Sequence, residues 1–123
     1  MPKKILLIDD EDLVRESLKK LLRKSGYDVI TARNGSEALQ NIQEDDFDLI
    51  ISDIRMPDMD GVEVVKRIRV YLKQKKKSIP EIIITGYASK ESLEEAAKLK
   101  VADYIYKPFN VKDFLEVVKR NVA

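Results

Sequence analysis

The sequence predicts an open, doubly wound α/β domain with a parallel five-stranded sheet and helices on both faces. Five short apolar runs of strand length recur along the 123 residues, and segments with helical spacing of apolar residues separate them. Short buried strands that alternate with helices pair in parallel through right-handed crossovers. A closed barrel would need about eight such units and roughly 250 residues. The open sheet therefore fits this chain.

Continuous apolar runs are typical of strands that are covered on both faces. The predicted strands are residues 4–8, 28–32, 48–52, 81–84 and 102–106. The third run ends in a carboxylate, Asp53, and a loop that contains Pro57 and Gly61 follows at once. A buried strand that ends in this way presents its acid at the edge of the sheet.

The segments between the strands are predicted to be helices. In the first of them the apolar positions are Val14, Leu18, Leu21 and Leu22. Asp10 is the predicted N-cap of this helix, and Gly26 is its predicted stop. Caps are also predicted at Asn34, Ser89 and Asn110. No linker, repeat or change of composition divides the chain, so residues 1–123 are predicted to form one domain.

Composition excludes several classes of protein. The chain has 23 basic and 22 acidic residues, and a net charge of +1 gives no overall case for binding nucleic acid or a membrane surface. No run approaches the ~20 apolar residues of a membrane span, and the first apolar stretch is too short for a signal peptide. We therefore expect a cytoplasmic protein. Without Cys or His, thiolate metal sites and the commonest general base are both excluded.

Polar residues follow four of the five predicted strands. They are Asp9 and Asp10, Asp53, Thr85, and Lys107, whereas the second strand ends at Thr31-Ala32 without such a group. The carboxyl ends of parallel strands lie at one edge of an open sheet, where ligands bind near the point at which strand order reverses. We therefore expect these five side chains to form one site, with the second strand at an edge away from it.

Three converging carboxylates repel one another unless a cation lies between them. Oxygen ligands without His or Cys favour Mg²⁺, with Mn²⁺ as the alternative and Ca²⁺ as a less suitable one. Lys107 adds a positive charge and Thr85 a hydroxyl donor. This combination suits phosphoryl transfer, which depends mainly on positioning and on neutralisation of charge. Asp53 is then left as the nucleophile that accepts the phosphoryl group.

The chain resembles the receiver domain of two-component response regulators over essentially its whole length. The resemblance rests on Asp9-Asp10-Glu11, Asp53 with Met56-Pro57-Asp58-Met59-Asp60-Gly61, Thr85-Gly86 and Lys107-Pro108. It implies the flavodoxin-like (CheY-like) strand order 2-1-3-4-5, and a switch that is phosphorylated on aspartate. The implied partner is a sensor histidine kinase or a phosphotransfer protein, and the domain is no enzyme beyond its own phosphorylation and dephosphorylation.

The resemblance also implies individual roles. The magnesium ligands would be Asp10 and Asp53 directly, Asp9 through water, and the main-chain carbonyl of Arg55. Lys107 would pair with the phosphoryl oxygens. Thr85 and Tyr104 would be the switch residues, and the readout surface would be the last helix, the helix before it and the strand between them. The bond before Pro108 is expected to be cis.

Finer features resemble receivers of the NtrC type, namely Ser52-Asp53-Ile54-Arg55-Met56-Pro57 and Thr85-Gly86-Tyr87. Such receivers usually precede an ATPase and a DNA-binding domain, and no GxxxxGK loop occurs here. An excised receiver and a stand-alone one both fit the sequence. An output domain, or a second copy of the chain on phosphorylation, is a further partner that the resemblance allows.

Two features depart from the usual pattern of the family. The turn before the fifth strand is Lys100-Val101-Ala102, where Gly is common, so the end of that helix is less predictable. Arg55 and Tyr87 are bulky, and each lies two residues after a site residue. We hypothesise that both hinder attacking water and prolong the life of the phosphoryl group.

Three other functions stay open. A partner-binding module of the same fold would not use Asp53, although the intact set of strand-end residues argues against it. A hydrolase of the haloacid dehalogenase kind would need a second Asp two residues after Asp53, where this chain has Arg55. Direct DNA binding has only the lysine run at 73–77 in its support, which is a weak signal without aromatic residues.

Overall fold

The computed structural model describes residues 2–86 and 90–122, without the side chains of Ser92 and Leu93. The predicted cap Ser89 lies outside the described residues. The described strands are β1 (Lys4–Ile8), β2 (Asp28–Ala32), β3 (Leu49–Asp53), β4 (Glu81–Thr85) and β5 (Asp103–Tyr106). The helices are α1 (Asp12–Lys24), α2 (Gly35–Glu44), α3 (Gly61–Gln74), α4 (Lys90–Leu99) and α5 (Val111–Val122). Each predicted strand is present within one residue of its expected bounds.

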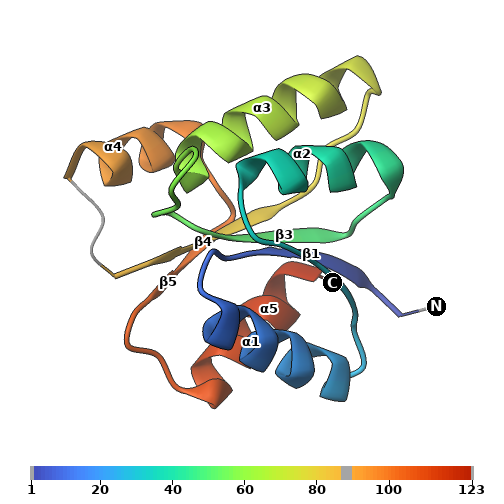
Figure 1. Cartoon of the computed structure of the whole chain (residues 1–123), viewed down its shortest axis with the longest axis vertical. Coiled ribbons are helices and arrows are strands. Elements are labelled where there is room, and N and C mark those ends of the chain that lie inside the picture. The colour runs from blue at the N-terminus through green and yellow to red at the C-terminus, as the bar shows by residue number, and fades with distance from the viewer. Residues whose placement is uncertain (1, 87–89, 123) are drawn as a thin grey trace.

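The sheet is parallel throughout, with the order β2-β1-β3-β4-β5. The predicted fold class and strand order are confirmed. Helices α1 and α5 cover one face, and α2, α3 and α4 cover the other (Figure 1). No described helix has both the length and the apolar character that a membrane crossing requires.

Alternate residues of the central strands supply the two halves of the core. Ile5 and Leu7 of β1 pack in the cluster that includes residues of α1 and α5. Their neighbours Leu6 and Ile8 pack in the cluster that includes residues of α2 and α3. All four side chains are fully buried. Because both faces are covered, the strands are apolar at consecutive positions rather than alternating with polar residues.

Side-chain caps begin three of the helices. Asn34 at α2, Asp60 at α3 and Asn110 at α5 each accept a hydrogen bond from the main-chain N–H three residues later. The predictions at Asn34 and Asn110 are therefore confirmed. These caps fix where each helix leaves the loop at the carboxyl edge of the sheet.

The predicted cap of α1 is wrong. The N-cap residue is Glu11, which makes no side-chain capping hydrogen bond. The carboxylate that faces this turn belongs to Asp9, whose Oδ1 accepts the Glu11 N–H at 2.9 Å. Asp10 lies outside the helix and is exposed. Its carboxylate is therefore not used by the helix.

The end of α4 is held by an arginine from α3. Both Nε and Nη2 of Arg69 donate to the buried Glu81 at 2.7 Å, and Nη1 donates to the Leu99 carbonyl. The next residue, Lys100, has a φ of 55°. A side chain in this left-handed region costs about 1–2 kcal/mol. Residues 100–102, where the sequence lacks the usual Gly, therefore form a strained turn. The hydrogen bond from Arg69 to the Leu99 carbonyl fixes the helix end beside this turn.

Candidate functional site

The carboxyl ends of four strands bring the predicted residues to one edge of the sheet. Asp9, Asp10 and Asp53 each place a carboxylate oxygen within 4.8 Å of the others. In the sheet Asp53 pairs with Ile84, the residue before Thr85. A cavity of about 210 Å³ opens there, lined by Asp10, Glu11, Asp53, Arg55, Gly86 and Lys107. Four of the five predicted residues therefore lie together, namely Asp9, Asp10, Asp53 and Lys107, whereas Thr85 is at the end of the adjacent strand and does not line the cavity.

Asp9 is the deepest of the three acids and is fully buried. Its Oδ1 accepts the Glu11 N–H, whereas Oδ2 is buried without a hydrogen-bond partner among the described residues. Burial and the charge of Asp53 raise the pKa of this carboxyl and the Glu11 hydrogen bond lowers it, so that the pKa is about 6. A buried, unpaired carboxylate oxygen beside two other acids fits the ligand set of a Mg²⁺ ion.

Asp53 pairs with Lys107 across the cavity. The distance from Lys107 Nζ to Asp53 Oδ2 is 3.2 Å, and the Asp53 side chain is 7% exposed. Burial lowers the pKa of Lys107, but the neighbouring Asp53 carboxylate outweighs it, so that the pKa is raised overall. The ammonium group is therefore charged at neutral pH and lies beside the carboxylate.

Glycines give two of these groups their space. A Cβ on Gly86 would lie 3.2 Å from Lys107 Cβ and 3.3 Å from Lys107 Cδ. A Cβ on Gly61 would overlap the main-chain carbonyl oxygen of Asp53. The loop after Asp53 can therefore pack on Gly61 only because this position lacks a side chain, and a side chain at Gly86 would crowd the stem of Lys107.

The loop after Asp53 is closed at its base. The Gly61 N–H donates to the Ile54 carbonyl at 2.8 Å, and the Arg55 N–H lies 3.4 Å from Asp53 Oδ1. The Arg55 side chain is exposed and lines the cavity. Tyr87, the second residue expected to overlook the site, lies outside the described residues.

The two predicted switch residues occupy neighbouring strands. Thr85 is 3% exposed at the end of β4, and its carbonyl accepts the Lys107 N–H at 2.8 Å. Tyr104 on β5 is half-buried against the cluster that contains Ile83 and Ala96. Its ring stacks on Tyr106, with 6.3 Å between the centroids. The Lys107-Pro108 bond is cis, as expected.

Arg15 is a residue near the site that the sequence did not indicate. Its side chain is 8% exposed, and Nη1 donates to the main-chain carbonyl of Asp9 at 3.0 Å. Nη2 donates to Asp12. The arginine thus fixes the turn between β1 and α1. The sequence did not predict this contact, because an Arg in the first turns of an amphipathic helix is usually exposed.

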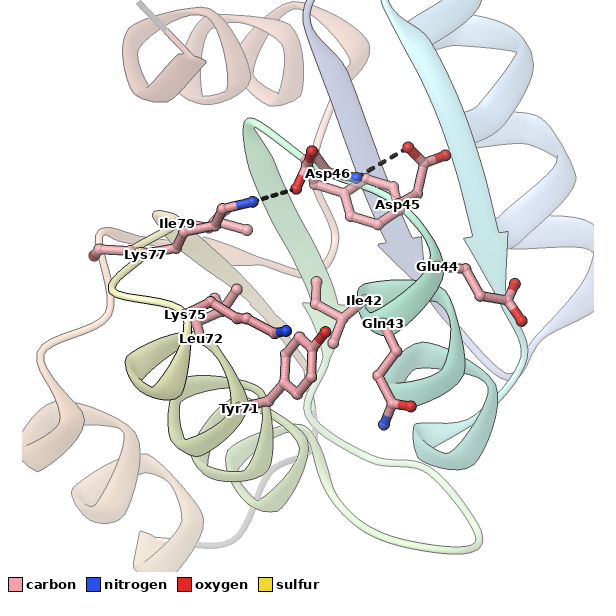
Figure 2. A pocket seen from close by; sticks show the side chains of 12 residues that line it. Ile42, Gln43, Glu44, Asp45, Asp46, Tyr71, Leu72, Lys75, Lys77 and Ile79 are labelled. Atoms are coloured by element: carbon pink, nitrogen blue, oxygen red, sulfur yellow. Dashed lines mark hydrogen bonds and ion pairs between the residues drawn. The ribbon is translucent and has the colours of Figure 1, made fainter.

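A larger hollow lies at the other end of the sheet, between the α2–β3 and α3–β4 connections. Figure 2 shows its lining, which includes Tyr71 of α3 and Lys75, the C-cap residue of that helix. Two of its acids are paired, Asp46 with Lys77 and Asp45 with Lys4. None of the strand-end residues lines this hollow, and it contains no group of the predicted site.

Comparisons with known proteins identify the family of the chain. The profile of the response regulator receiver domain family matches residues 5–119. The transcriptional regulatory protein ZraR of Klebsiella oxytoca is 42% identical over 106 residues, which are 86% of this chain and 23% of that protein. The sporulation initiation phosphotransferase F of Bacillus subtilis (strain 168) is 32% identical over 120 residues, or 98% of this chain and 94% of that protein.

A solved receiver domain has the same fold. The CheY-like protein from Methanospirillum hungatei JF-1 superposes with a TM-score of 0.90 at 33% identity, over 99% of this chain and 94% of that one. The chain spans only about a quarter of the length of ZraR. Several of the relatives are transcriptional regulatory proteins, which agrees with the predicted NtrC-like subtype. Because the family profile covers nearly all of the sequence, this chain belongs to the response regulator receiver domain family.

Proposed function

We propose that this chain is a phosphoryl-accepting switch in two-component signalling, with Asp53 as the acceptor. One observation carries the proposal. A nearly buried carboxylate lies beside a charged lysine and two further carboxylates at the rim of a cavity. No packing requirement explains this gathering of charge, whereas phosphoryl transfer requires it.

The metal ligands in this proposal are Asp9, Asp10, Asp53 and the main-chain carbonyl of Arg55. The buried, unpaired Oδ2 of Asp9 supports the fit to Mg²⁺, or to Mn²⁺ as the alternative. When bound, the ion would supply positive charge that offsets the repulsion of the acids and of the phosphoryl oxygens.

In the transfer step an oxygen of Asp53 forms a bond to phosphorus as the P–N bond of a phosphohistidine breaks. The imidazole leaves with the electron pair of that bond, and Asp53 becomes an acyl phosphate. Lys107 neutralises charge on the phosphoryl oxygens from its position 3.2 Å from Asp53. Hydrolysis by water later restores the carboxylate and releases inorganic phosphate.

The response is proposed to involve Thr85 and Tyr104. The Thr85 hydroxyl would donate to the new phosphoryl group, and Tyr104 would turn inward behind it. The half-buried position of Tyr104 beside the cluster that contains Ile83 and Ala96 supports this role. The surface that changes is α4, β5 and α5.

The phosphate donor in this proposal is a sensor histidine kinase or a phosphotransfer protein, since the chain has no His of its own. The chemistry is limited to the chain's own phosphorylation and dephosphorylation. The relatives that are transcriptional regulators support an output domain or a phosphorylation-dependent homodimer as further partners.

The test is phosphorylation with a small acyl phosphate and Mg²⁺, followed by intact-mass measurement. Wild-type protein is expected to gain one phosphate, and Asp53→Asn is expected to gain none. An Asp46→Asn variant is the matched control, since Asp46 is exposed and pairs with Lys77 at the other end of the sheet, and it should still be labelled. Equal labelling of wild type and Asp53→Asn would contradict the proposal and leave the partner-binding alternative.

The exposed Arg55 side chain at the cavity gives a prediction about the lifetime of the phosphoryl group. Arg55→Ala is expected to speed phosphate loss by about 3- to 10-fold, a change on the order of 1 kcal/mol in the barrier, because water reaches Asp53 more easily. Tyr87→Ala is expected to act in the same direction. Loss of the added mass with time measures both rates. Arg67→Ala on α3 is the control, and a lifetime in Arg55→Ala equal to that of wild type would refute the hypothesis.

A further inference from the structure

The loop that follows Asp53 is attached to the start of α2 by Asp58. Its carboxylate accepts the main-chain N–H groups of Gly35 and Ser36, each at 3.1 Å, and the Ser36 hydroxyl at 3.2 Å. Oδ1 also accepts the Met59 N–H of its own loop at 2.9 Å. One side chain thus joins two segments that are more than 20 residues apart in the sequence.

These contacts complete the hydrogen bonding at the start of α2. The first N–H groups of a helix have no partner within the helix. Asn34 accepts the Glu37 N–H, and Asp58 accepts the Gly35 and Ser36 groups that precede it. A negative charge here is also favoured by the helix dipole. Burial raises the pKa of Asp58, but these hydrogen bonds outweigh it and leave the pKa below its usual value.

An apolar contact holds the loop at the same place. Met59 packs against the cluster that contains residues of α2 and α3. A Cβ on Gly35 would overlap Met59 Cγ and would lie 2.6 Å from its Sδ. The side chain of Met59 therefore occupies the space that the glycine leaves open on the first turn of α2. The loop is fixed by two independent contacts.

The same loop carries the main-chain carbonyl of Arg55. Residues 54–60 are closed at the base by the Gly61–Ile54 hydrogen bond and held at the far side by Asp58. A loop that is already ordered loses less conformational entropy when one of its groups binds a ligand. The contact of Asp58 with α2 therefore orders the loop that carries this carbonyl.

We propose that Asp58 is a positioning residue, which fixes the loop 54–60 on α2 and thereby sets the affinity of the site for Mg²⁺. The proposal rests on the proposed function, because it takes the acid cluster to be a magnesium site. By thermodynamic linkage the effect is reciprocal, so that bound Mg²⁺ strengthens the Asp58 contact. The start of α2 then responds to the state of the phosphorylation site.

The test compares Asp58→Ala with Asn34→Ala, which removes a hydrogen bond from the same helix end without touching the loop. Titration calorimetry is expected to show Mg²⁺ binding weakened about 3- to 10-fold by Asp58→Ala, less than the roughly 10- to 100-fold for residues that contact metal ligands directly. Asn34→Ala should stay within twofold of wild type. Asp58→Asn keeps one acceptor oxygen and should give an intermediate value.

Amide hydrogen exchange gives a second measurement. In metal-free protein, Asp58→Ala should speed exchange in residues 54–60, and Asn34→Ala should not. In wild type, Mg²⁺ should slow exchange at Gly35 and Ser36. Equal Mg²⁺ affinity in the Asp58→Ala and Asn34→Ala variants would overturn the role of Asp58, while labelling of Asp53 would still stand. Wild-type protein that binds no Mg²⁺ would overturn both proposals.

Discussion

Asp9→Asn is expected to stabilise the metal-free protein by about 3 kcal/mol at pH 7. The wild-type Asp9 carboxylate is fully buried, has one oxygen without a partner, and lies near the charge of Asp53. Folding at neutral pH must therefore accommodate a charge that the folded state disfavours. Asn has nearly the same shape and carries no charge, so this cost is removed.

The pH dependence of stability follows from the raised pKa of Asp9. The folded-state pKa is about 6, against 3.8 for an unperturbed Asp, so between these values the folded protein binds more protons than the unfolded chain. The contribution of Asp9 to the free energy of unfolding therefore falls as pH rises from about 4 to about 6, and stays low above that. The difference between wild type and Asp9→Asn should grow over this range.

Urea denaturation in a chelator at pH 4, 5, 6 and 7 measures this difference. Glu116→Gln, at an exposed carboxylate on α5, is the control and should differ little from wild type at any of these pH values. Mg²⁺ at about 100 times its dissociation constant should stabilise wild type by about 2.7 kcal/mol, and should stabilise Asp9→Asn much less. A metal-free Asp9→Asn protein less stable than wild type at pH 7 would contradict the account.

Much of this site was predictable because its parts lie at the ends of strands. A strand such as Leu49–Asp53 is visible in the sequence as an apolar run, and parallel pairing then brings each strand end to the same edge. Asp53 and Lys107, 54 residues apart, reach the same edge through parallel pairing, and the strand order that the resemblance implies places only β4 between their strands.

The contacts that fix the loops could not be predicted in the same way. Asp58 lies in a turn, where an Asp is common for local reasons, and nothing in the sequence indicates that it caps a helix 22 residues earlier. Arg15 similarly resembles an exposed helix residue, yet it holds the Asp9 carbonyl. The predicted N-cap at Asp10 failed because the N-cap lies one residue later, at Glu11, whose N–H is held by Asp9. Which partner each of these side chains binds depends on three-dimensional packing, which the sequence pattern does not reveal.

Lys107→Gln is expected to slow phosphorylation of Asp53 about 100-fold, a loss typical of removing one preorganised charge or donor from a transition state. The Lys107 ammonium lies 3.2 Å from Asp53 Oδ2, and the phosphoryl oxygens must arrive beside that carboxylate. Gln keeps much of the side chain's length and loses its charge. The rate is measured by intact mass over time with an acyl phosphate, and Lys112→Gln on α5 is the control.

The experiment is done at saturating Mg²⁺, because loss of Lys107 leaves three neighbouring acids with one cation fewer. The ion restores that balance, and thermal melting checks that the variant is folded. Lys107→Arg should not restore the rate, since a planar guanidinium spreads its charge over a wider group than the compact ammonium that lies 3.2 Å from Asp53 Oδ2. A Lys107→Gln rate within threefold of wild type would contradict the assigned role, because charge neutralisation would then come from the metal alone.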